Sequence, residues 1–130
     1  MNTTNLDQFD ENGQKTGGWR EHFKDGKLAV FSRYANGVRH GKCTYYLRNG
    51  NVKGEGNFEH GKMTGEWHFY RENGELWQIG NFSADLKEGR FVRYHPGGQL
   101  QDEGDFCAGR KCGEWREYSR DGSLAKVTTH

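Results

Sequence analysis

A period of 24 residues constrains the fold of this chain more than any other feature of its sequence. Glycine recurs at this spacing five times, at Gly17, Gly41, Gly65, Gly89 and Gly113. A second series has the same period, namely Gly26, Gly50, Gly74, Gly98 and Gly122. Because one short unit cannot bury its apolar face alone, such a period predicts stacked copies of a single supersecondary unit.

The apolar and aromatic residues follow the same period. Two residues after each first glycine stand Trp19, Cys43, Trp67, Phe91 and Trp115. The other recurring sets are Tyr46, Tyr70, Tyr94 and Tyr118; Leu28, Leu76 and Leu100; and Phe58, Phe82 and Phe106. Since a repeated fold places equivalent residues in equivalent environments, we expect these residues, with Cys43 as a small buried substitute for a ring, to form the structural core.

Each unit contains two turn signals. One series is Asp25-Gly26, Asn49-Gly50, Asn73-Gly74, Gly97-Gly98 and Asp121-Gly122, and the other is Asn36-Gly37, His60-Gly61, Ala84-Asp85 and Ala108-Gly109. Such pairs supply the positive φ angles of hairpin turns, and strands joined by tight turns are antiparallel. The sequence therefore predicts an all-β, elongated and twisted antiparallel meander of about nine or ten strands, two per repeat.

The period also divides the chain. We expect one repeat domain over residues 1–130, which begins with a degenerate N-terminal cap over 1–16. Complete repeats follow at 17–40, 41–64, 65–88 and 89–112, and a half repeat at 113–130 forms the C-terminal cap.

Composition narrows the class of protein. Only 32% of the residues are hydrophobic, but 14% are aromatic, which favours a thin core of rings. The formal net charge is +1, so no strong field attracts the chain to nucleic acid, and no apolar run is long enough for a membrane span. The N-terminus lacks the pattern of a signal peptide, and an odd number of cysteines, 3, favours reduced thiols and a cytoplasmic location.

The sequence resembles a known repeat. Gly65-Glu66-Trp67-His68-Phe69-Tyr70, then Asn73-Gly74-Glu75-Leu76 and Gly80-Asn81-Phe82, is similar to the MORN-variant repeat. The resemblance extends over about residues 9–128. Bacterial proteins that consist only of such repeats include the YwqK-like group, described as antitoxins of toxin–antitoxin systems. It implies a protein that binds and neutralises a toxin, or an immunity protein for a secreted effector. Related repeats also serve as scaffolds and membrane-apposed modules.

Neither catalytic nor metal-binding residues are predicted. The chain has no nucleophile, phosphate-loop or zinc-peptidase motif, and its glycines are explained by turns. The 6 histidines share no ligand spacing, so we expect no metal and no cofactor. Cys107 and Cys112 flank a turn, and a disulfide across the hairpin is conceivable, but we expect free thiols.

A few apolar residues break the period, and we interpret these as anchors for a protein partner. Trp77 and Ile79 stand where other repeats have Ala, Lys, Gln or Glu, and Phe31 is equivalent to Ile79. Tyr45 and Phe69 likewise replace charged residues. We expect all five on a variable face of the sheet, because rings that the period does not require are typical of binding hot spots. Local packing is the alternative explanation.

An acidic rim completes the predicted surface. Glu55, Asp102, Glu103 and Asp105 would lie beside the anchors and suit a basic partner. The sequence thus favours a cytoplasmic, non-enzymatic antitoxin or immunity protein that occludes its toxin stoichiometrically. The alternative is a structural scaffold or membrane-apposed module. Self-association through exposed sheet edges is possible, and nucleic-acid binding is not expected.

Overall fold

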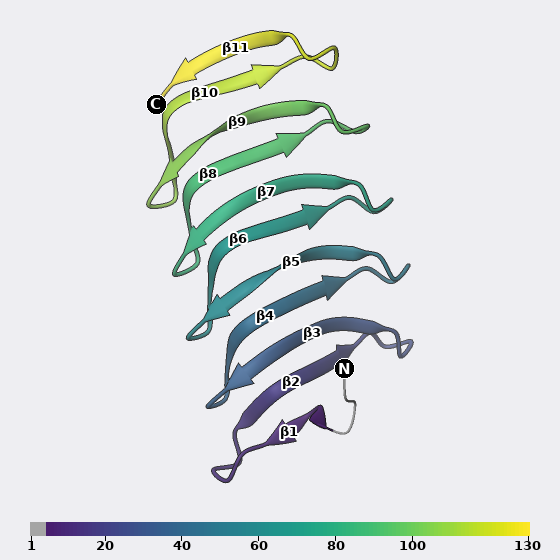
Figure 1. The fold of residues 1–130 in the computed structure, drawn as a ribbon. Coiled ribbons are helices and arrows are strands. Elements are labelled where there is room, and N and C mark those ends of the chain that lie inside the picture. Colours follow the sequence, from purple (N-terminus) through teal and green to yellow (C-terminus); the bar gives the residue numbers. More distant parts are fainter. Residues whose placement is uncertain (1–4) are drawn as a thin grey trace.

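The computed structural model describes residues 5–130, so the first four residues of the predicted N-terminal cap lie outside it. The chain forms a single antiparallel sheet in which each strand pairs with the next one along the sequence (Figure 1). The strands are β1 (Gln8–Phe9), β2 (Lys15–His22), β3 (Leu28–Ala35), β4 (Val38–Tyr46), β5 (Val52–Glu59), β6 (Lys62–Tyr70), β7 (Leu76–Ser83), β8 (Leu86–Tyr94), β9 (Leu100–Cys107), β10 (Arg110–Tyr118) and β11 (Leu124–Thr129).

The predicted fold class, an elongated all-β meander, is confirmed. The sheet has 11 strands rather than nine or ten, because the short β1 adds to β2. The predicted turn residues adopt the left-handed backbone conformation, as Asn36 and Gly37 show with φ of 52° and 82°. In Figure 1 the strands follow one another from the N-terminal to the C-terminal end of a long ribbon, and no second layer covers the described part of it.

Two irregularities recur in every complete repeat. Between β6 and β7 the register shifts at Phe69/Tyr70, where Phe69 pairs with Gln78 and Tyr70 pairs with Leu76. Trp77 is left as an extra residue, which defines a β-bulge. Between β5 and β6 the register shifts again, where Gly65, Glu66 and Trp67 stand opposite Gly56; Gly65 has a φ of 70°, which glycine adopts readily. The bulge at Trp77 has one extra residue and so changes which β7 residues share a face, whereas the second irregularity has two and does not.

The two faces of the sheet can be assigned from the register. Residues directly opposite each other share a face, and neighbours along a strand alternate. One row across the sheet is Val30, Tyr45, Gly54, Phe69, Gln78, Arg93 and Asp102, and the face that contains it and Trp67 is called the ring face. The opposite face, called the mixed face, contains the row Phe31, Thr44, Glu55, His68, Ile79, Val92, Glu103 and Arg116.

The core of this single-layer sheet consists of rings that lie over glycines. Trp67 is 1% exposed, and its ring covers Gly56 so closely that a Cβ there would overlap it. Phe91 covers Gly80 in the same way, and Trp115 covers Gly104. The ring therefore packs on bare backbone of the preceding strand, which is how one layer without a second sheet excludes water from large apolar groups.

The repeat that contains Cys43 has no ring over a glycine and packs differently. Where the repeats of Trp67, Phe91 and Trp115 have a glycine under the ring, this one has Ser32, which pairs with Cys43, and both are buried. The guanidinium of Arg39 lies nearby, with its Cζ 5.5 Å from the Phe58 ring centroid and 5.9 Å from that of Tyr45. A small side chain at the ring position thus accompanies a larger one at the glycine position.

Two sequence predictions about this core are wrong. Tyr70 and Tyr118 do not share a face with Trp67 and Trp115, because each tyrosine is three positions after its tryptophan and the bulge lies in the other strand. Their hydroxyl groups donate to Glu55 and Glu103 on the mixed face, at 3.2 and 2.8 Å. The second prediction concerns Leu76, expected in the core with the rings: because of the bulge it pairs with Tyr70 and so does not share a face with Gly80 and Phe82.

The expectation of free thiols is wrong for one pair. Cys107 and Cys112 form a disulfide across the β9–β10 hairpin, with their Cα atoms 5.8 Å apart. The short turn at Ala108-Gly109 holds the two strands within bonding range, which is the geometric condition for such a bond. Cys43 remains a free thiol in the core.

Candidate functional site

The predicted anchor and rim residues divide between the two faces. Phe31, Ile79, Glu55 and Glu103 lie in one row of the mixed face. Ile79 has His68 and Val92 as its cross-strand neighbours, which makes a small half-buried apolar patch. Phe31 lies at a distance from it, with its ring against Gly18 and Leu6. The mixed face therefore holds one compact patch at Ile79 and a separate ring near the N-terminus.

The expected position of Phe69 and Tyr45 on this face is wrong. Both residues lie on the ring face, where Phe69 stacks on Trp67 with ring centroids 6.1 Å apart. The Tyr45 ring centroid lies 6.3 Å from that of Trp67. Both are half-buried and pack against the cluster of Cys43, Phe58 and Trp67. Alternation from Trp67 to Phe69 and from Cys43 to Tyr45 gives this face, whereas the prediction grouped both rings with Ile79 because they replace charged residues of other repeats.

Trp77 lies in neither row. As the extra residue of the bulge it has no cross-strand partner, and its ring centroid is 6.0 Å from the Arg71 guanidinium carbon. It is half-buried at the turn end of β7. Simple alternation along the strand, which placed Trp77 and Ile79 together, fails at this bulge.

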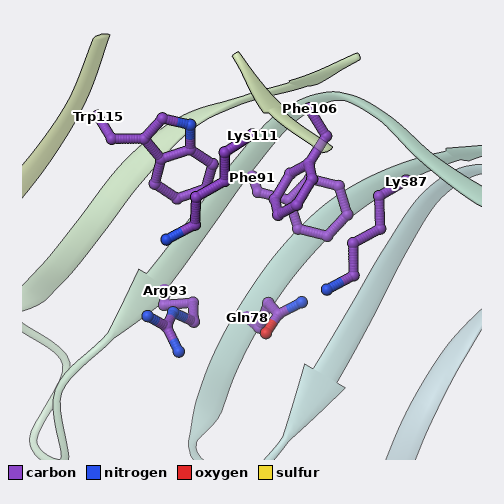
Figure 2. A pocket seen from close by; sticks show the side chains of 7 residues that line it. All are labelled: Gln78, Lys87, Phe91, Arg93, Phe106, Lys111 and Trp115. Atoms are coloured by element: carbon purple, nitrogen blue, oxygen red, sulfur yellow. The ribbon is translucent and has the colours of Figure 1, made fainter. Parts of the chain in front are cut away.

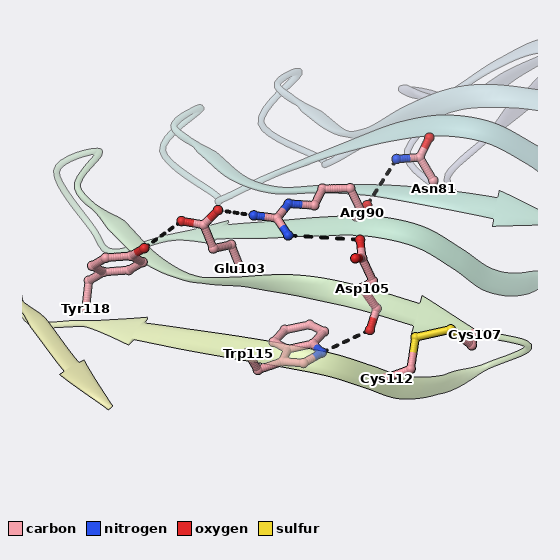
Figure 3. Close-up of polar contacts among 8 residues, drawn as sticks. All are labelled: Asn81, Arg90, Glu103, Asp105, Cys107, Cys112, Trp115 and Tyr118. Carbon is pink, nitrogen blue, oxygen red and sulfur yellow. Dashed lines mark hydrogen bonds and ion pairs between the residues drawn. A yellow bond between two sulfur atoms is a disulfide. The ribbon is translucent and has the colours of Figure 1, made fainter. Parts of the chain in front are cut away.

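Figure 3 shows the acidic residues of the C-terminal repeats. Glu103 accepts hydrogen bonds from Arg90 and from Tyr118, and it is directly opposite Arg116. The carboxylate of Asp105 lies 4.0 Å from Arg90. The hydrogen bond to Glu103 is the largest cause of the raised pKa of Tyr118. These acids are thus paired within the chain and add little net negative charge to the mixed face.

Asp102 does not belong to an exposed rim. Its side chain is on the ring face, is 3% exposed, and accepts a hydrogen bond of 2.9 Å from the Nε of Arg93. A second contact joins the Arg93 Nη2 to the other carboxylate oxygen. The pKa of Arg93 is raised, chiefly by this hydrogen bond. The pair forms because Arg93 and Asp102 are directly opposite each other on β8 and β9.

The ring face has a hollow of about 160 Å³ near its C-terminal end (Figure 2). It is lined by Gln78, Lys87, Phe91, Arg93, Phe106, Lys111 and Trp115. The ammonium group of Lys87 lies 4.9 Å from the Phe106 ring centroid, and that of Lys111 lies 4.5 Å from that of Trp115. Both lysines and the ends of Arg93 and Gln78 face the same hollow. It combines apolar walls with cations, an arrangement suited to an anionic group attached to an apolar one.

Sequence reasoning missed Lys87, Lys111 and Arg93, although the period contained a signal for the lysines. Two residues before the first glycine of each repeat stand Lys15, Arg39, Met63, Lys87 and Lys111. Lys15 likewise lies over Trp19, at 4.6 Å from its ring centroid. A cation that recurs at one repeat position must lie at one place relative to the ring, so the period predicts a cation beside nearly every ring.

The described residues show little sign of metal chemistry. His40 and His60 lie with ring centroids 5.1 Å apart, but the Nδ1 of His40 accepts a hydrogen bond from the backbone N–H of His60. Over residues 5–130 no group of three or more His, Cys, Asp or Glu side chains gathers as metal ligands would. In the same range no helix is long and apolar enough to cross a membrane.

Comparison with known proteins identifies the repeat. The family described as MORN repeat variant matches three consecutive segments, residues 39–60, 63–84 and 87–108, which together make up half of the chain. Among solved structures, the chain is similar to one in the crystal structure of the GtfA/B complex bound to UDP and GlcNAc, with 10% identity and a TM-score of 0.33. That match covers 82% of this chain and 21% of the other, so this chain spans about a fifth of its length. No relative is found among the curated proteins.

Proposed function

Because the chain belongs to the MORN repeat variant family, we propose that it is a non-enzymatic scaffold that binds a protein partner across its open sheet. The observation that carries this proposal is a ring-lined face with no covering layer in the described residues (Figure 1). Its rings are held by glycine contacts and cross-strand pairs before any partner arrives. Binding to such a preorganised surface costs little ordering entropy in the protein itself.

The finer part of the proposal is that the partner is a toxin or effector and that this chain neutralises it by stoichiometric occlusion. It rests on the resemblance to the YwqK-like antitoxins. The cytoplasmic location is part of the same proposal. A disulfide such as Cys107–Cys112 is rare in reducing compartments, so the location needs its own test by fractionation with thiol trapping.

The experiment that tests the binding function is recovery of partners from the native host with the tagged protein as bait. A parallel bait carries Trp77→Ala and Ile79→Ala, which removes the two period-breaking apolar residues of β7, neither of which lies on the ring face, and so tests the predicted anchors separately. We expect one dominant partner with the first bait. If Trp77 is a hot spot, its truncation weakens binding by about 2 kcal/mol or more. Full retention by the folded double variant would remove Trp77 and Ile79 from the interface.

Titration separates an antitoxin from an enzyme. With purified partner, an occluding protein abolishes the partner's activity at a fixed molar ratio, whereas an enzyme acts at substoichiometric amounts over time. Neutralisation that continues to grow at a small molar ratio contradicts occlusion. Absence of a dominant partner, together with retention on lipid vesicles or self-association, favours the structural or membrane-apposed module.

A further inference from the structure

The two lysines of the ring-face hollow have no acidic partner. Among residues 5–130 neither Lys87 nor Lys111 forms an ion pair, and their ammonium groups lie over the rings of Phe106 and Trp115. The third cation of the hollow, Arg93, is neutralised by Asp102. The hollow therefore has an excess positive charge that comes from two residues.

This excess contrasts with the charges on the mixed face. There Glu103 and Asp105 contact Arg90, and Glu55 accepts from Tyr70, so the acids predicted to attract a basic partner already have partners within the chain (Figure 3). On the ring face Glu117 lies directly opposite Asp102 and is close enough to Arg93 to raise its pKa, but it does not line the hollow. The charges that line the hollow without an ion pair among residues 5–130 are therefore the two lysines, and both are positive. The complementary group is an anion.

The dimensions and surroundings restrict this anion. The hollow has a volume of about 160 Å³, and one water molecule takes up about 30 Å³ in the liquid. The hollow is therefore the size of about five waters, which suits the end of one side chain. A nucleic-acid backbone or a membrane surface favours basic residues spread over a broad area, whereas the chain as a whole has a formal net charge of only +1. The apolar walls formed by Phe91 and Phe106 accommodate the methylene groups or the ring that neighbours the charge.

We propose that the hollow between Lys87 and Lys111 receives a Glu or Asp side chain from a segment of the protein partner in which an apolar residue is adjacent to the acid. This inference rests on the proposed protein-binding function and specifies the partner's chemistry. The rings hold both ammonium groups beside the hollow, so a carboxylate that enters it forms charge-assisted hydrogen bonds without first ordering the lysines.

A defined peptide tests the proposal. The probe is a nine-residue acetylated peptide with Glu-Phe-Glu at its centre and Gly and Ser elsewhere, and its matched control has Gln-Phe-Gln. Binding is followed by the indole N–H signal of Trp115, which lines the hollow and donates to the Asp105 carbonyl. We expect the Glu peptide to shift this signal and to bind at least tenfold more tightly than the Gln peptide, with an affinity that falls as salt is raised.

Matched variants locate the effect. The double variant Lys87→Gln, Lys111→Gln should lose at least tenfold in affinity for the Glu peptide. The control is Lys15→Gln, which removes an equivalent cation from Trp19 in the first repeat and should leave peptide binding unchanged. Circular dichroism and thermal unfolding verify that the variants fold. Equal binding of both peptides, an unmoved Trp115 signal or unchanged affinity in the double variant overturns the proposal, as does lysine-dependent binding to phosphatidylserine vesicles without binding to the peptide.

The double variant also serves as bait with the native host's proteins. If wild type and double variant recover the same partner equally, the protein-binding function stands and the acidic-segment proposal fails. If wild type recovers no partner, the protein-binding function fails, whatever the peptide does.

Discussion

Replacement of Gly56 by alanine tests the packing rule that holds this single-layer sheet together. Gly56 has no unusual backbone conformation, so alanine meets no backbone strain there. The added methyl group overlaps the Trp67 ring, which is 1% exposed. The substitution therefore isolates the contact between the ring and the bare backbone.

The destabilisation expected from Gly56→Ala lies between two limits. If the ring slides aside within the core, overpacking costs about 1–3 kcal/mol. If the ring is expelled, about 200 Å² of apolar surface returns to water, which costs about 5 kcal/mol at 25 cal/mol per Å². Loss of glycine's freedom in the unfolded chain offsets about 0.5–1 kcal/mol of this. We therefore expect the free energy of unfolding to fall by about 1–4 kcal/mol, between these two limits.

The assay is urea unfolding followed by circular dichroism and tryptophan fluorescence, in a double-mutant cycle with Trp67→Ala. In the Trp67→Ala background the space is empty, so Gly56→Ala should be neutral or slightly stabilising. Gly80→Ala with Phe91→Ala provides an independent pair with the same contact. As a graded control, an alanine at Gly54 meets Phe69 at 3.0 Å and should cost less than at Gly56.

The chain contains its own precedent for the coupled change. Ser32 and Cys43 occupy the glycine and ring positions of one repeat. The double substitution Gly56→Ser, Trp67→Cys should therefore be more stable than Gly56→Ser alone. An equal cost of Gly56→Ala in the presence and absence of the Trp67 ring would refute the packing rule.

Three further outcomes follow from contacts elsewhere in the sheet. The carboxylate of Asp7 accepts hydrogen bonds from Arg20, which lower its pKa below the ordinary 3.8. Its contribution to stability is fully present above pH 3.8 and is lost as the pH falls through the lowered pKa. Acidification should therefore release the segment that contains β1, which the Trp19 indole signal reports, and Asp7→Asn should abolish this pH dependence. The Cys107–Cys112 bond closes a very short loop, so its reduction should lower stability by about 2 kcal/mol, and unchanged urea unfolding after reduction would contradict this. Burial raises the pKa of the Cys43 thiol, so a thiol reagent at neutral pH should label no cysteine of the native oxidised protein. The same reagent should label one cysteine of the unfolded oxidised protein. Rapid labelling of the native protein would show that this part of the core opens.

The sequence by itself determined the fold class. Turn pairs such as Asn36-Gly37 act locally, because positive φ is a property of a residue and its immediate neighbours, and their regular spacing defines the strands. The recurrence of Trp67, Phe91 and Trp115 also indicated a ring core, because a repeated unit has repeated contacts.

Only the tertiary structure decided which residues share a face. Alternation along a strand predicts a face until a bulge inserts a residue, and the bulge at Trp77 is visible only in the pairing of two strands. Phe69, Tyr45 and Tyr70 follow plain alternation along β4 and β6, but the bulge puts Leu76 on the face opposite to that of Gly80. The same holds for charge: Asp102 is buried because Arg93 is opposite it, while Lys87 and Lys111 meet only rings. The composition gives the net charge of the chain, but the register of the strands decides which charged side chains have no oppositely charged neighbour.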